Sequence, residues 1–99
     1  MTQPAVKGWT FLTNHAHVLL ALAREPTARL RDVATSVGIT ERAAQAIVAD
    51  LEAAGYLERQ RVGRRNAYTI NAAGRFRHPA EADHRIGELI GLFTGTPQG

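Results

Sequence analysis

The sequence predicts a mostly helical α+β domain in which three helices are followed by a small β-hairpin and a C-terminal helix. Three observations predict this fold class. Apolar residues recur every three or four positions up to residue 54, the period of helices that bury one face. The pattern changes to that of strands on both sides of Gly63, and helical spacing returns after residue 79. A chain of 99 residues with 44% hydrophobic content is sufficient for one compact core.

The first helix is predicted over residues 14–23. Thr13 can cap its N-terminus, and Pro26 disfavours helical backbone at the residue before it. The predicted apolar face consists of Phe11, His15, Val18 and Leu22. We expect this helix to be scaffold, with His15 and His17 as packing or surface residues.

The second and third helices, predicted over residues 31–37 and 40–54, meet across a three-residue turn that starts at Gly38. A glycine can adopt the left-handed conformation that ends a helix, and Thr40 can cap the helix that follows. The expected buried residues of the pair are Val33, Ala34, Val37, Ala44, Ile47, Val48 and Leu51. The third helix then presents an outer face of Arg42, Ala43, Gln45, Ala46 and Ala49.

A β-hairpin follows, with predicted strands at residues 56–62 and 67–70. The predicted turn covers residues 63–66, where Gly63 and Asn66 suit positive φ angles. Six arginines and no acidic residue lie between residues 59 and 80, whereas the rest of the chain carries six Lys/Arg and nine acids. The cluster is either an ordinary solvated face or a surface that binds phosphates, and its place at a hairpin tip favours phosphate binding.

The outer face of the third helix suits the major groove of DNA. Small side chains let a helix enter a groove about 12 Å wide, and arginine and glutamine have the donor patterns that read guanine and adenine. Arg42 and Gln45 supply these two side chains. The alternative is that these residues form only the solvent-exposed face of an alanine-rich helix and do not bind DNA.

Residues 30–57 resemble winged helix-turn-helix transcription regulators of the MarR/ArsR-like kind. The resemblance is carried by L-x-x-V-A-x-x-V-G-I-T from Leu30, D-L-E-x-x-G-Y-L from Asp50 and R-V-G-R-R-N-x-Y from Arg61, and it extends over about residues 10–70. It implies a three-helix core, a basic wing and a C-terminal helix, with sequence-specific binding of double-stranded DNA. Helix 40–54 would read the major groove, and wing 59–68 would contact phosphates or the minor groove. Two positions depart from the pattern, Ala46 and Asp50.

The expected DNA-binding residues come from the third helix and the wing. They are Thr40, Arg42, Ala43, Gln45, Arg59, Arg61, Arg64, Arg65 and Asn66. Residues 8–77 form the predicted DNA-binding domain.

Residues 78–94 are predicted to be a dimerisation element built on a helix over residues 79–93. A short helix with two glycines must pack against something to be stable. The predicted interface of a homodimer consists of Ala82, Ile86, Leu89, Ile90 and Phe93. The alternative is that this stripe covers the chain's own first helix.

Other function classes have less support in the sequence. Ser36 is the only serine and cysteine is absent, so the usual nucleophiles of an enzyme are missing and we expect no catalysis. An ArsR-like metal-responsive repressor remains an alternative, because His78, Asp83, His84 and Glu88 lie close in sequence. A winged helix that binds an acidic protein is another. We expect a cytoplasmic protein with no membrane contact, no metal and no cofactor, and the sequence leaves a small-molecule effector open.

Overall fold

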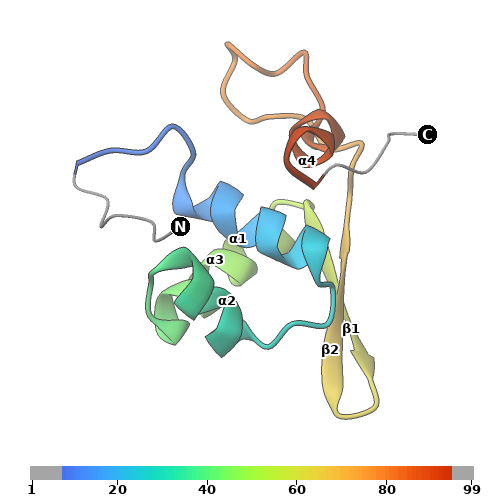
Figure 1. Ribbon diagram of the computed structural model, residues 1–99. Helices are drawn as coiled ribbons and strands as arrows, with labels where there is room; N and C mark the ends of the chain where they lie inside the picture. The colour runs from blue at the N-terminus through green and yellow to red at the C-terminus, as the bar shows by residue number, and fades with distance from the viewer. Residues whose placement is uncertain (1–7, 95–99) are drawn as a thin grey trace.

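The computed structural model describes residues 8–94, which form three packed helices, a hairpin and a fourth helix (Figure 1). The elements in chain order are α1 (Asn14–Arg24), α2 (Leu30–Val37), α3 (Glu41–Ala53), β1 (Leu57–Val62), β2 (Arg65–Ile70) and α4 (Ile86–Thr94). The predicted fold class is therefore confirmed. None of the helices in the described part of the chain has the length and apolarity needed to cross a membrane.

The local signals at the ends of the first three helices act as predicted. Thr13 caps α1 by accepting a hydrogen bond from the Ala16 amide at 3.2 Å, and Thr40 caps α3 through the Ala43 amide at 3.0 Å. Gly38 ends α2 with a φ of 89°. These short-range contacts set the angle at which α3 leaves α2.

The core lies between the three helices and the base of the hairpin. It consists of Val18, Leu19, Leu22, Val33, Ile47, Val48, Leu51, Leu57, Tyr68 and Ile86. The expected inner faces of α2 and α3 are therefore confirmed, with Val37 only partly buried. Phe11 is a correction, because its side chain is 91% exposed and lies before α1 instead of on the buried face.

The hairpin turn is shorter than predicted. Val62 pairs with Arg65 and Arg61 with Asn66, so only Gly63 and Arg64 form the loop. Gly63 has a φ of 63°, as the first position of a two-residue loop often requires, and no other described residue of the hairpin has positive φ. Asn66 is therefore a strand residue, and the prediction that it bends the turn is wrong.

The last helix begins at Ile86 and not at Pro79. Residues 78–84 form turns, so Ala82 lies outside α4. The Arg75 guanidinium donates to the Asp83 carbonyl at 2.9 Å and to the Ala82 carbonyl at 3.5 Å, which holds these residues in a turn. The polar stretch from residue 81 to 85 would also bury almost nothing as a helix.

α4 packs against the rest of the chain. The Ile86 amide donates to the Gly74 carbonyl at 2.7 Å, and the Arg24 guanidinium of α1 reaches the Phe93 carbonyl at 3.1 Å. Ile86 is only 7% exposed and belongs to the core. The sequence left open whether the apolar stripe of this helix packs on the chain's own first helix or on a second copy. Ile86 packs within its own chain, and Ile90 is partly buried against the same core.

Candidate nucleic-acid interface

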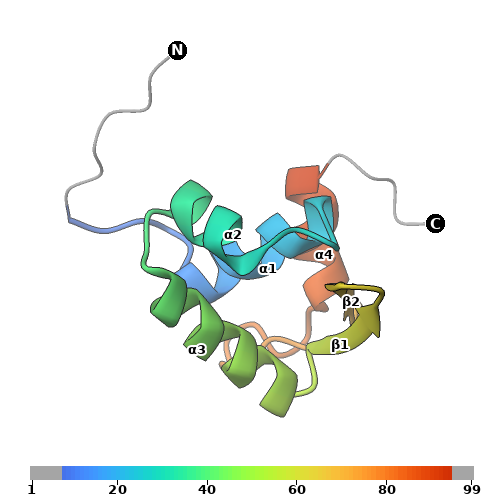
Figure 2. The same cartoon turned by 90° about the horizontal axis from the view of Figure 1, so that it is seen from below.

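α3 presents an open face of mostly small side chains. Helical geometry turns Ala44, Ile47 and Val48 into the core, which leaves Arg42, Gln45, Ala46 and Ala49 exposed. Ala43 is half-buried. Figure 2, the view from below, shows that α3 and the hairpin lie on the same side of the molecule.

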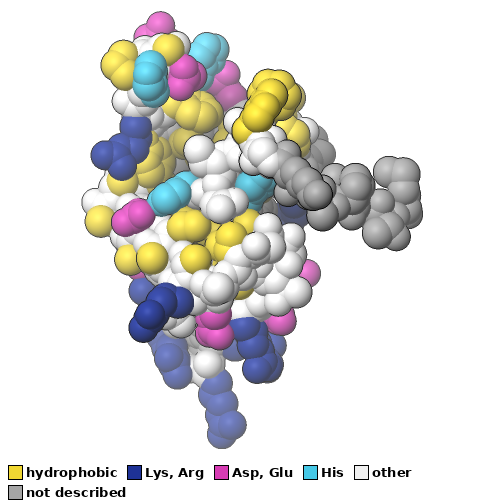
Figure 3. All heavy atoms as spheres, turned by 90° about the vertical axis from the view of Figure 1, so that its left-hand side faces the viewer, with side chains coloured by type: hydrophobic (Ala, Val, Ile, Leu, Met, Phe, Trp, Pro, Cys, Tyr) yellow, Lys and Arg dark blue, Asp and Glu magenta, His cyan; other side chains and the backbone are white. Residues whose placement is uncertain are grey.

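A groove of about 690 Å³ separates α3 from the hairpin and from the loop before α2. Its polar walls carry four arginines and, among the described lining residues, a single acid, Glu41. The basic residues are Arg29, Arg59, Arg64 and Arg65. In Figure 3 the Lys and Arg side chains gather at the lower end of the molecule, the end of the hairpin in Figure 1. This concentration of positive charge beside an open helix face suits a phosphate backbone.

The arginines of the hairpin differ in how they are held. Arg59 forms a two-bonded ion pair with Glu52 of α3, with Nη2–Oε1 at 2.8 Å and Nε–Oε2 at 3.2 Å. This hydrogen bond to Glu52 raises the pKa of Arg59 above its usual value. Arg65 donates to the Thr27 carbonyl at 2.9 Å, and Arg61 donates to the Gly63 carbonyl at 3.1 Å.

Arg64 occupies the tip of the hairpin and is exposed. Its guanidinium has no hydrogen bond or ion pair with any other residue in the described range 8–94. Arg59 therefore connects the hairpin to α3 and Arg65 connects it to the loop between α1 and α2, whereas Arg64 is available to an external anion.

Sequence reasoning missed Arg29. This residue precedes α2 and lines the same groove as Arg64 and Arg65. The amide of Tyr68 in β2 donates to the Pro26 carbonyl at 2.9 Å, which brings the loop before α2 against the hairpin. No local sequence pattern encodes that long-range contact.

The two departures on α3 have different positions. Ala46 is exposed, so the helix has a small residue where it could meet DNA. Asp50 instead turns toward α1 and pairs with His15, with Nε2–Oδ2 at 2.8 Å. Asp50 does not line the groove, and its charge is directed to the opposite side of α3.

Of the residues on which the metal-site alternative rests, only His84 and Glu88 are in contact with each other. His84 Nδ1 lies 2.9 Å from Glu88 Oε1, and His78 is 3.9 Å from Glu81. Within residues 8–94 no three His, Asp or Glu side chains form a cluster that could hold a metal ion. The hydrogen bond with Glu88 raises the pKa of His84, and bonds from the Arg85 amide and His84 lower the pKa of Glu88.

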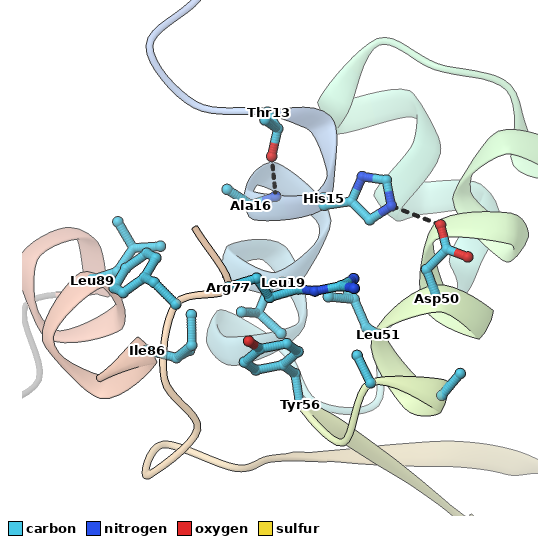
Figure 4. A pocket seen from close by; sticks show the side chains of 13 residues that line it. Thr13, His15, Ala16, Leu19, Asp50, Leu51, Tyr56, Arg77, Ile86 and Leu89 are labelled. Carbon is cyan, nitrogen blue, oxygen red and sulfur yellow. Dashed lines mark hydrogen bonds and ion pairs between the residues drawn. The ribbon is translucent and has the colours of Figure 1, made fainter. Parts of the chain in front are cut away.

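A second cavity, of about 740 Å³, lies away from the basic groove between α1, the end of α3 and α4 (Figure 4). Its floor is apolar, with Leu19, Leu51, Ile86 and Leu89. Thr13, His15, Asp50 and Arg77 stand at its polar side. It shares no lining residue with the basic groove.

Comparison with known proteins agrees with this geometry. The sequence pattern of the MarR family matches residues 9–65, more than half of the chain. The chain is also similar to the PcaV transcriptional regulator from Streptomyces coelicolor, solved in complex with its natural ligand, at 25% identity and a TM-score of 0.55. That match covers 89% of this chain and 64% of the other, so this chain spans less than two thirds of that regulator's length. No curated protein matches the chain. The helix-turn-helix, the hairpin and the family match together show that this chain belongs to the MarR family.

Proposed function

We propose that this protein is a transcription regulator that binds double-stranded DNA with α3 in the major groove. The hairpin contacts the phosphates beside that groove or the adjacent minor groove. Because its ligand is genomic DNA, the protein works in the cytoplasm. A DNA-reading role needs no catalytic group.

The observation that carries this proposal is the basic groove beside the open face of α3. Arg29 and Arg64 stand on its walls, and Gln45 faces it from α3. A helix with exposed alanines can approach base edges closely, and the arginines of the groove beside it can contact backbone phosphates. Family membership supports the same function.

In this arrangement Arg42 and Gln45 determine sequence preference. Gln45 Nε2 lies 3.5 Å from Glu41 Oε2, a weak contact that DNA can replace. Each side chain can make two hydrogen bonds to one base, which is worth about 1–3 kcal/mol of discrimination.

The experiment is selection of bound sequences from random duplexes, followed by titration of variants on a selected and a scrambled site. Arg42→Ala and Gln45→Ala should lose that discrimination while binding to the scrambled site changes little. Arg85→Ala is the matched control for Arg42→Ala, because it removes the same charge from the segment before α4, which does not line the basic groove. If both α3 variants keep the full preference for the selected site, α3 is not the reading helix.

The competing function is a module that binds an acidic protein through the same arginines. Duplex binding releases counterions, so its affinity falls with salt by about 0.9 log units per log unit for each phosphate contacted. No measurable binding to random duplexes at low salt would favour the protein partner.

We also propose a homodimer, since one module with few base contacts seldom reaches useful specificity. The exposed side of α4 supports it, with Leu92 76% and Phe93 48% exposed. Leu89 and Phe93 are the predicted interface residues that remain open to a second copy, whereas Ile86 is used inside the chain.

A further inference from the structure

The apolar cavity on the side away from the basic groove is not filled by any side chain of residues 8–94. Four of its lining side chains are Leu19, Tyr56, Phe76 and Leu89, and its volume of about 740 Å³, which is open to solvent on one side, has room for one or two aromatic rings. Figure 4 shows Ile86 and Leu89 on one side of this space and His15 and Asp50 on the other. A cavity of this kind suits an apolar body that carries a hydrogen-bond donor.

Two large aromatic side chains project into solvent in the segment that leads into α1. Trp9 is 73% exposed and Phe11 is 91% exposed, and their rings meet edge to face with centroids 4.9 Å apart. Thr13, two residues further on, already belongs to the cavity wall. An aromatic pair exposed to water is an apolar patch of the kind that marks an interaction site.

We propose that the cavity receives Trp9 and Phe11 of a second copy of this chain, so that two copies exchange their aromatic pairs. The proposal rests on the homodimer proposed above and specifies its contact. A twofold axis requires a patch that is complementary to itself. Here the projecting pair lies two to four residues before Thr13 of the cavity wall, so the pair and the cavity both belong to the N-terminal end of α1, and reciprocal insertion can use both.

The area is adequate for a stable dimer. Aromatic side chains bury about 150–250 Å² each, so the four in a dimer bury about 600–1,000 Å². The walls that they cover lose a comparable area. The total reaches the range of roughly 1,200–2,000 Å² that stable interfaces need.

The polar side of the cavity suits an indole ring. The exposed carboxylate of Asp50 can accept the Trp9 ring N–H, the one polar group of that side chain. Arg77 supplies a guanidinium that can lie over the ring face. Ala53 and Ala54, at the end of α3, also line the cavity, so the exchange would fix the distance between the two reading helices.

Trp9 is the only tryptophan of the chain, so its fluorescence reports on this contact alone. Dilution of the intact protein from about 100 µM to about 10 nM should move the emission from shorter to longer wavelength, in parallel with dissociation measured by sedimentation. Trp9→Ala/Phe11→Ala should be folded and shifted at least tenfold toward monomer. Ala53→Phe, which fills the cavity from an exposed wall position, should shift the equilibrium likewise and leave Trp9 in water.

Val62→Ala is the matched control, because it removes an exposed apolar side chain from the hairpin and should leave the dimer unchanged. An intact dimer in Trp9→Ala/Phe11→Ala would overturn this proposal but leave both a dimer through α4 and DNA binding standing. Short-wavelength emission from the diluted monomer would place Trp9 in its own cavity, which also overturns it. Binding of free indole to the cavity of a protein whose Trp9 stays in water at every concentration would assign the cavity to a small molecule instead.

Discussion

Arg59 and Arg64 have the same side chain and lie five positions apart in the hairpin, yet their surroundings give them different roles. Arg59 is held by the Glu52 carboxylate, which already neutralises much of its charge. Arg64 stands at the tip beyond every such partner in the described residues. An arginine paired with an acid interacts less strongly with a phosphate than an unpaired one. We therefore infer that Arg59 holds the hairpin in place and that Arg64 contacts DNA.

Arg64→Ala should weaken binding to specific and random duplexes by similar factors, because phosphate contacts position without specifying sequence. The plot of log affinity against log salt should become shallower by about 0.9, the loss of one phosphate contact. Arg59→Ala should leave that slope nearly unchanged and lower the free energy of unfolding by only about 0.2–1 kcal/mol, since the ion pair is partly exposed to water.

The two variants are measured in parallel by filter binding or anisotropy at four salt concentrations and by urea unfolding. A slope that falls equally in both variants would show that Glu52 releases Arg59 to DNA. A slope unchanged in both would show that neither Arg59 nor the tip of the hairpin contacts a phosphate.

At the scale of elements, the sequence predicts the end of a helix correctly where that end is determined by contacts between residues close in sequence. Gly38 and Thr40 were predicted to end α2 and to cap α3 because each acts on amides or carbonyls within a few residues. The start of α4 was predicted seven residues too early, because Arg75 holds the Ala82 and Asp83 carbonyls and no periodicity in the sequence shows that contact. Arg29 was missed for the same reason, since its place in the groove depends on packing between the loop and β2.

The N-terminus of α4 is stabilised by a charged pair whose effect depends on pH. Glu88 accepts from the Arg85 amide at 2.9 Å and contacts His84 at the same distance. The raised pKa of His84 contributes stability that is complete below its ordinary value of 6.5 and is lost as the pH rises through the raised value. The lowered pKa of Glu88 contributes stability that is complete above its ordinary value of 4.5 and is lost as the pH falls through the lowered value.

The protection of α4 amides from hydrogen exchange should therefore be greatest between about pH 4.5 and 6.5, after correction for the intrinsic exchange rate. Glu88→Gln should make the protection depend less on pH both below 4.5 and above 6.5, because it removes the carboxylate that titrates at low pH and that raises the pKa of His84. Glu81→Gln serves as the control, since Glu81 lies 3.9 Å from His78 in the preceding turn. A profile that keeps its shape in Glu88→Gln would show that the pair has no role in holding the helix.

At the scale of the whole molecule, α4 belongs to two surfaces at once. Its first turn completes the core through Ile86, and its last turns leave Leu92 and Phe93 in solvent. Division of the chain after residue 77 would therefore remove part of the core together with the proposed dimer contact. A fragment that ends at residue 77 should therefore not be a stable folded monomer.

Single substitutions separate these two roles of α4. Ile86→Ala should lower the free energy of unfolding by about 2–5 kcal/mol, the usual cost of deleting a buried branched side chain. Phe93→Ala should change the unfolding of the monomer by no more than about 0.5 kcal/mol, because the ring is 48% exposed, and should weaken dimerisation instead. Urea unfolding at two protein concentrations tells the effects apart, because only a dimer contact makes the midpoint depend on concentration. If Phe93→Ala destabilises the monomer as much as Ile86→Ala does, then the whole of α4 serves the fold of one chain, and the dimer must be held by another surface.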